Sequence, residues 1–105
     1  MWSPVTGCDL LAYDERFFRV EVKTAGARDA SRPTMFRWST SRGSRNKQRV
    51  TIQHCDVIAL VALPMRRVVF RNTKSITGKN TSLSASHFVE GCEAATWDEA
   101  KTWKP

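Results

Sequence analysis

Apolar and polar residues alternate most clearly over residues 16–24, near the start of the chain. Phe18, Val20 and Val22 fall on one face of an extended segment, and polar residues occupy most positions of the other face. A second apolar segment, residues 8–13, precedes it across the polar pair Asp14-Glu15. Aromatic and β-branched residues are frequent in both segments. The pattern predicts a β-hairpin.

Three further apolar segments predict three more strands. Residues 34–40 form one of them, after a loop at 26–33 that is rich in Gly, Asp, Ser and Pro. Residues 56–63 are almost continuously apolar, which is typical of a central strand covered on both faces. Residues 67–71 predict a shorter strand beside it.

The C-terminal third predicts a loop followed by helices. Residues 72–82 are rich in Ser, Thr and Lys and are expected to form a loop, and a short helix is expected over 85–92. Thr96 and Glu99 have the spacing of a capping box, which predicts a last short helix over 97–103. The order of elements indicates an α+β (α/β-like) fold with a mixed β-sheet of about five strands and C-terminal short helices.

Length and composition narrow the class of protein. A chain of 105 residues with 41% hydrophobic residues is sized for a single domain over residues 1–105. No apolar run approaches the roughly 20 residues of a membrane helix, and the first residues do not read as a signal peptide. We therefore expect a cytoplasmic protein that does not enter a membrane. The three cysteines are widely spaced, so reduced thiols are expected in place of disulfides or zinc ligands.

Positive charge is concentrated in the middle of the chain. The net charge is +7, and residues 28–49 carry seven basic side chains against one acidic side chain. Residues 66–79 add five basic side chains and no acid. Such a distribution favours a polyanionic partner, because phosphate binding releases condensed counterions. The polar segment 41–49 is expected to be an exposed loop, and its candidate DNA contacts are Arg42, Arg45, Lys47, Gln48 and Arg49.

The predicted hairpin brings acidic side chains together if its turn has the right length. A three-residue turn pairs Tyr13 with Phe17, which places Asp9 opposite Glu21. Opposed residues have Cβ atoms about 5 Å apart. A two-residue turn would shift the register by one and place Asp9 opposite Val20 instead.

Two carboxylates at this separation repel each other, and a divalent cation between them would remove the repulsion. Oxygen ligands suit Mg²⁺ or Mn²⁺, so Asp9, Glu21 and the carbonyl of Val22 are candidate metal ligands. Lys23 lies on the same strand face as Glu21. There its amine is placed to contact a scissile phosphate, or to hold or deprotonate an attacking water.

The segments GCDLL and RVEVKT resemble the core motif of the PD-(D/E)xK nuclease superfamily. The resemblance is strongest to small Holliday-junction-resolvase-like enzymes and to homing endonucleases of group I introns. It implies a restriction-endonuclease-like sheet, a single PD-(D/E)xK nuclease-like domain over residues 1–105 and Mg²⁺-dependent hydrolysis of DNA. Asp9, Glu21 and Lys23 take the catalytic positions of the motif.

The resemblance departs from the family pattern at the N-terminus. Family members usually carry a helix that packs on the sheet before the strand bearing the Asp, whereas eight residues precede Asp9 here. A bare sheet face would follow, and we expect a homodimer or a higher homo-oligomer to cover it.

Two other classes of function remain open. One is a non-catalytic nucleic-acid-binding module on the same scaffold. The other is a structural or interaction protein, such as a small phage or mobile-element product, whose basic surface meets an acidic protein. Metal-dependent cleavage distinguishes the nuclease from both.

Overall fold

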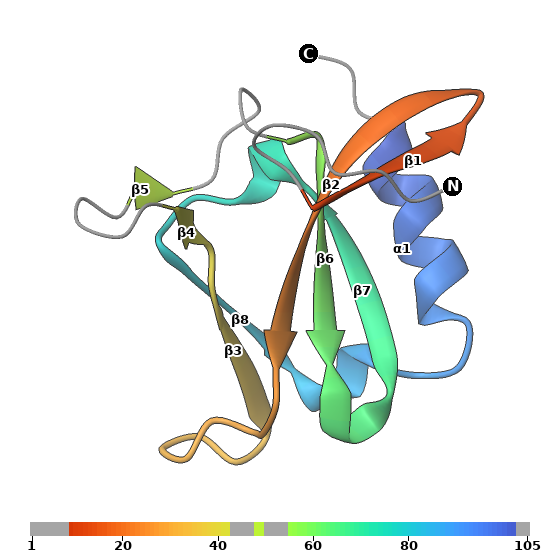
Figure 1. Cartoon of the computed structure of the whole chain (residues 1–105). Coiled ribbons are helices and arrows are strands. Elements are labelled where there is room, and N and C mark those ends of the chain that lie inside the picture. The colour runs from red at the N-terminus through yellow and green to blue at the C-terminus, as the bar shows by residue number, and fades with distance from the viewer. Residues whose placement is uncertain (1–8, 43–47, 50–54, 103–105) are drawn as a thin grey trace.

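A mixed four-stranded β-sheet lies at the centre of the fold (Figure 1). The computed structural model describes residues 9–42, 48–49 and 55–102. The strand order is β1-β2-β6-β7, in which β2 and β6 run parallel and the two outer pairs run antiparallel. The strand bounds are Leu10–Asp14 for β1, Arg16–Ala25 for β2, Val57–Ala62 for β6 and Arg67–Asn72 for β7.

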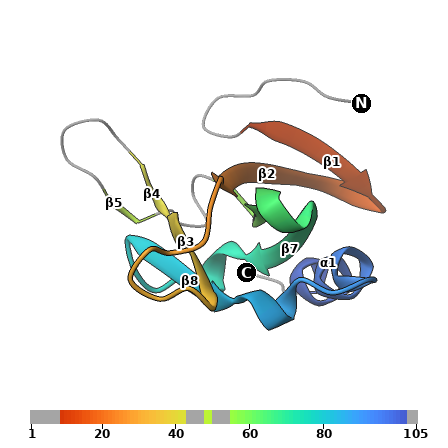
Figure 2. The ribbon, with the colours of Figure 1, turned by 90° about the horizontal axis from the view of Figure 1, so that it is seen from below.

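Two small β-ladders lie beside the main sheet. Strands β3 (Met35–Ser39) and β8 (Asn80–Ser84) pair antiparallel, although 40 residues separate them in the sequence. Strands β4 (Ser41–Arg42) and β5 (Gln48–Arg49) form a two-residue antiparallel ladder. The β4–β5 pair projects away from the main sheet, on the side opposite to β1 (Figure 2).

Helical structure lies mainly at the C-terminal end of the described chain. The α-helix α1 spans Cys92–Lys101. Among the described residues, short 3₁₀ turns connect β6 to β7 (Leu63–Met65), β7 to β8 (Thr73–Ser75) and β8 to α1 (Ala85–His87). No helix of the described residues is long and apolar enough to cross a membrane.

The main sheet is buried on both faces, because different elements cover each face. On one face, α1 contributes Ala100 and Trp97 to a core that also includes Phe18, Val20, Val57, Ala59, Val68 and Phe70. On the other face, the β3–β8 pair supplies Phe36 and Trp38, which are 0% and 2% exposed. The central position of β6 explains the continuous apolar run of the sequence.

An aromatic cluster anchors the β3–β8 pair to the sheet. The ring centroids of Phe36, Trp38 and Phe88 lie 5.6–6.0 Å from one another. Trp38 Nε1 also donates a hydrogen bond to the carbonyl of Val61 at 3.0 Å. This bond satisfies the single polar group of a buried side chain, so Trp38 is fixed in position as well as buried.

The structure confirms the α+β fold class and the five strands that hydrophobic patterning predicts. The main sheet has four strands where about five were predicted, because residues 35–39 pair with β8 outside it. The predicted loop over 72–82 is wrong in part, since β8 begins at Asn80. The expected bare sheet face is also wrong for the described residues, because α1 covers one face and β3–β8 the other.

The predicted C-terminal helices also differ from the structure. The segment expected to be helical over 85–92 contains a single 3₁₀ turn, Ala85–His87. One α-helix, Cys92–Lys101, follows it in the described residues, so Thr96 lies inside the helix and does not cap it. The helix begins after Gly91, whose positive φ of 85° is readily accessible to glycine. Thr96 instead accepts a hydrogen bond from β7, a contact that no local pattern reveals.

Candidate active site

The β1–β2 hairpin has the register expected for a three-residue turn, which is one of the two registers that the sequence left open. Tyr13 pairs with Phe17, and Leu11 pairs with Arg19. Glu15 lies at the turn with a φ of 66°, a left-handed conformation that ordinary residues seldom adopt. This register directs the backbone of residue 9 toward the second half of β2.

Asp9 lies just before β1 and contacts β2 through both its backbone and its side chain. Its N–H donates to the carbonyl of Val20 at 3.1 Å. Its Oδ2 accepts a hydrogen bond from the N–H of Val22 at 2.7 Å. The carboxylate therefore bonds the β2 backbone from a position one residue before β1. It remains exposed to solvent. Val22, whose N–H the Asp9 carboxylate contacts, lies between Glu21 and Lys23, the two other residues of the candidate motif.

Glu21 and Lys23 lie on the face of β2 that is turned toward the β3–β8 pair. Glu21 is 6% exposed, which is unusual for a carboxylate. Its Oε2 lies 3.6 Å from Lys23 Nζ, and the Lys23 side chain is 25% exposed. A buried carboxylate is costly without a cation close by, so the ammonium of Lys23 offsets part of that cost.

The Asp9 carboxylate thus bonds the backbone of Val22, the residue that lies between Glu21 and Lys23 in the sequence. The N–H and C=O groups of one strand residue point to the same side of the strand. Because the N–H of Val22 points to Asp9, its carbonyl points to the same side. Two carboxylates and one carbonyl make an all-oxygen donor set, which fits a hard cation such as Mg²⁺. No cluster of three or more His, Cys, Asp or Glu side chains that could hold a metal occurs within residues 9–42, 48–49 and 55–102.

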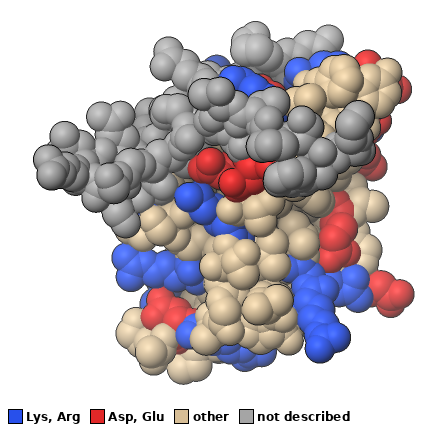
Figure 3. All heavy atoms as spheres, viewed as in Figure 1, with Lys and Arg blue, Asp and Glu red and all other residues tan. Residues whose placement is uncertain are grey.

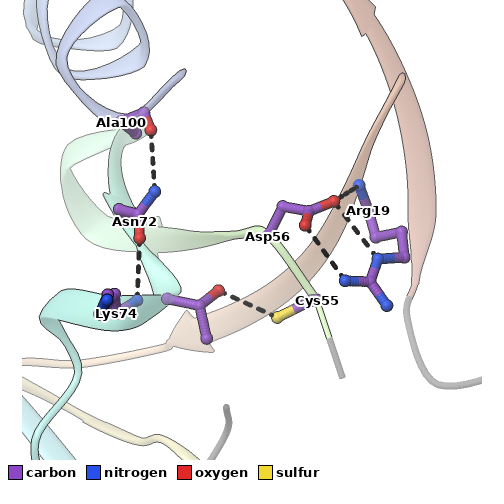
Figure 4. A network of polar contacts seen from close by, with 7 residues as sticks. Arg19, Cys55, Asp56, Asn72, Lys74 and Ala100 are labelled. Carbon is purple, nitrogen blue, oxygen red and sulfur yellow. Dashed lines mark hydrogen bonds and ion pairs between the residues drawn. The ribbon is translucent and has the colours of Figure 1, made fainter. Parts of the chain in front are cut away.

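A second ion pair lies next to this site and was not anticipated from the sequence (Figure 4). Asp56 Oδ2 accepts hydrogen bonds from the backbone N–H of Arg19 at 2.8 Å and from its Nε at 3.3 Å, while Oδ1 accepts one from its NH2 group at 3.1 Å. Burial alone would raise the pKa of Asp56, but the hydrogen bonds from Arg19 outweigh it and hold the pKa below its usual range. Arg19 is two residues before Glu21, so this pair fixes the strand that carries the motif.

The cysteine beside Asp56 is a protonated thiol. Burial raises the pKa of Cys55 to about 11, and the nearby carboxylates of Glu21 and Asp56 add to the shift. Its Sγ lies 3.4 Å from the hydroxyl of Thr73, which forms part of the polar network in Figure 4. A thiol with this pKa is poorly nucleophilic near neutral pH, so Cys55 is excluded as a catalytic nucleophile.

The candidate DNA-binding residues are placed only in part. Arg45 and Lys47 lie outside the described residues. Arg42 pairs with Gln48, and Arg49 pairs with Ser41, in the β4–β5 ladder. The segment expected to be an exposed loop therefore begins and ends as paired strands that project from the body (Figure 2).

Charge on the described surface is mixed. In Figure 3, the coloured face is largely neither acidic nor basic, and its Lys and Arg side chains lie in separate groups with Asp and Glu side chains near some of them. The described residues of that face therefore form no continuous basic patch. The basic excess of segment 28–49 includes side chains that the structure does not describe.

Comparisons with protein-family models, with curated proteins and with solved structures found no match to this chain.

Proposed function

We propose that this protein is a Mg²⁺-dependent DNA endonuclease that hydrolyses phosphodiester bonds. One observation carries the proposal: the Asp9 carboxylate bonds the backbone of Val22 at 2.7 Å, between buried Glu21 and its partner Lys23. Two acids and an amine from adjacent strands then share one short stretch of the sheet. A PD-(D/E)xK motif needs two acids and an amine on neighbouring strands, and this placement supports the proposal.

The strand arrangement supports the same proposal. The acid-bearing hairpin lies beside a parallel strand, β6, so β2 is an internal strand with a partner on each side. Internal strands are more rigid than loops, and catalytic groups on them hold their positions more precisely. Mn²⁺ has the same preference for oxygen ligands and is expected to replace Mg²⁺.

Each motif residue has a separate task in the proposed reaction. Asp9, Glu21 and the carbonyl of Val22 would hold the cation, which supplies Lewis-acid activation of the phosphate and of a bound water. Lys23 would contribute a positive charge beside the scissile phosphate, where negative charge develops. Its ammonium lies 3.6 Å from Glu21 Oε2, beside one of the proposed metal ligands.

A plasmid-nicking assay with purified protein tests this function. Supercoiled plasmid should be nicked in Mg²⁺ or Mn²⁺ and left intact in EDTA. Lys23→Ala and Glu21→Gln should each reduce the nicking rate by about 100-fold or more, because each removes a charge that acts in the transition state. Glu90→Gln, which removes the charge of an exposed acid outside the site, is the matched control and should retain the wild-type rate.

Equal nicking by Lys23→Ala and wild type would rule out the motif as the catalytic site.

No nicking by any protein, together with retained DNA binding, would support the second candidate, a non-catalytic nucleic-acid-binding module. One observation favours that module: among the described residues, no group of three or more His, Cys, Asp or Glu side chains could hold a metal ion. We also propose DNA as the partner and a homodimer as the assembly, since cutting both strands of a duplex calls for two sites.

A further inference from the structure

We propose that the exposed aromatic pair Tyr13 and Phe17 is a stacking platform for unpaired bases of single-stranded DNA. The inference rests on the proposed function, and it names the substrate class: DNA that carries a single-stranded segment next to the cleavage site. The two rings lie at the tip of the β1–β2 hairpin.

Both rings are unusually open to solvent. Tyr13 is 69% exposed and Phe17 is 61% exposed. Their centroids lie 5.0 Å apart with an angle of 65° between the ring planes. In such an edge-to-face contact the edge of one ring covers at most one face of the other, so further aromatic faces stay available for a base to stack on.

The hairpin tip extends beyond the neighbouring strand. Pairing between β2 and β6 begins at Val20, and Asp56, directly before β6, bonds Arg19, so the hairpin tip at residues 13–17 lies beyond both contacts (Figure 1). The outer side of the tip is therefore accessible to a ligand as large as a nucleic-acid strand. Trp97 and Phe18 pack on the opposite face, against each other, with a centroid distance of 5.2 Å, and they hold the hairpin on the body.

The rings share a strand face with the candidate catalytic residues. Phe17, Glu21 and Lys23 alternate on the same side of β2, and Tyr13 is paired with Phe17. Four residues of strand span about 13 Å. Stacked nucleotides advance about 3.4 Å each along one strand, so about four of them would reach from the rings to the motif.

The size of the patch favours bases over a protein surface. Burying both rings completely would remove roughly 300 Å² from solvent, judged from the area of aromatic side chains. A stable protein interface needs about 800 Å² on each partner. Stacking on a base needs a single ring face, and the net charge of +7 favours a polyanionic strand.

Fluorescence anisotropy in EDTA tests the platform independently of cleavage. The probes are a labelled single-stranded oligothymidine and a labelled duplex of equal length, with an oligouridine probe as a third arm. The 105-residue chain is compared with a Tyr13→Ala/Phe17→Ala variant, a Tyr13→Leu/Phe17→Leu variant and a ring-exchanged Tyr13→Phe/Phe17→Tyr variant. A Leu63→Ala/Val89→Ala variant is the matched control, since these side chains are 55% and 57% exposed at other sites.

Loss of the rings should weaken binding of oligothymidine about ten-fold or more and change duplex binding less than about two-fold. The Leu pair should be as defective as the Ala pair, because leucine keeps apolar area without a flat π-face. The ring-exchanged variant and the control variant should bind as wild type does. Thermal melting and circular dichroism establish that each variant is folded.

Four results would overturn the platform. They are wild-type binding by the Leu pair, equal weakening toward duplex and single strand, ring-dependent binding of oligouridine alone, and a dimer by sedimentation that the Ala pair converts to a monomer. The two proposals fail separately. Ring-dependent binding without plasmid nicking contradicts the nuclease alone, and metal-dependent nicking without ring-dependent binding contradicts the platform alone.

Discussion

Asp56 shows how one residue can hold two strands in register. Its backbone N–H donates to the carbonyl of Arg19 at 2.8 Å, and its side chain accepts from the backbone N–H and the guanidinium of the same residue. Its own carbonyl accepts from the N–H of Thr73 at 3.0 Å. Parallel pairing of β2 and β6 starts one residue later, so Asp56 determines where that pairing begins.

Replacing Asp56 with Asn should destabilise the fold in a pH-dependent manner. The folded-state pKa of Asp56 is lowered, so the stability it contributes is present above about pH 5 and is lost as the pH falls below about 4. We expect Asp56→Asn to lower the free energy of unfolding by about 1–2 kcal/mol at pH 7 and by much less at pH 3. Urea unfolding at both pH values measures this.

The matched control for Asp56 is Asp98→Asn. Asp98 pairs with Lys101 at 3.4 Å, but its side chain is 71% exposed, so the change should cost little at either pH. A constant difference between Asp56→Asn and wild type from pH 7 to pH 3 would contradict the role of its charge.

Single residues of the site were predictable only where the local pattern fixes them. The hairpin itself follows from the apolar pattern, but its register depends on the length of the turn, which the sequence left open between two alternatives. The bond from Val22 N–H to Asp9 depends on where β1 starts, which alternation does not specify. The Arg19–Asp56 pair joins residues 37 positions apart, and no spacing in the sequence signals it.

At the scale of elements, the helix α1 closes one edge of the sheet. Glu93 Oε2 accepts from the N–H of Val68 at 3.0 Å, and Thr96 Oγ1 accepts from the N–H of Phe70 at 3.0 Å. These donors lie on β7, the last strand of the sheet, and they would otherwise be available to another chain. Polar side chains of α1 therefore take the place of a fifth strand.

Removing one of these acceptors should destabilise β7, the edge strand of the sheet. Thr96→Val keeps the shape of the side chain but leaves the Phe70 N–H without its acceptor, which should cost about 1–2 kcal/mol of unfolding free energy. Hydrogen exchange at the Phe70 amide should accelerate more than exchange at the neighbouring amides of β7. Thr102→Val is the control, since that hydroxyl bonds the carbonyl of Glu99 in the last turn of the helix. Equal losses of stability in the two variants would contradict the edge contact.

Strands with alternating or continuous apolar residues were predictable, and polar elements were not. β8 has the polar sequence NTSLS, whose composition does not favour a strand. It is extended because it pairs with β3. The start of α1 was misplaced for a related reason. The Thr-x-x-Glu spacing at residue 96 matches a helix cap, but the Thr96 hydroxyl donates to the carbonyl of Cys92 at 2.6 Å inside a helix that has already begun.

At the scale of the whole molecule, the end of the described chain is tied to its beginning. Asp14 Oδ2 in the first strand accepts from Trp97 Nε1 at 2.7 Å and from Lys101 Nζ at 2.9 Å. These hydrogen bonds, from Trp97 and then from Lys101, hold the pKa of Asp14 below its usual value. These bonds hold the hairpin against α1. Both the proposed catalytic motif and the proposed Tyr13–Phe17 platform depend on the position of that hairpin.

The net charge of +7 makes a prediction for the molecule as a whole. If DNA is the partner, log affinity should fall linearly with log salt concentration, with a slope of about −0.9 for each phosphate contacted on a duplex. The Arg45→Ala/Lys47→Ala variant should reduce that slope by about two. Arg66→Ala/Arg71→Ala removes the same charge from β7 and the turn before it, and it is the matched comparison. Anisotropy titrations at several salt concentrations measure the slopes.

Equal reductions in the two variants would mean that charge acts over the whole surface, with no special role for the β4–β5 segment. A slope near zero for the wild-type protein would argue against a polyanionic partner, because counterion release accompanies all phosphate contacts. It would also remove the support that the basic composition lends to the nuclease and to the binding module. The acidic-protein partner would then be the stronger explanation of the charge.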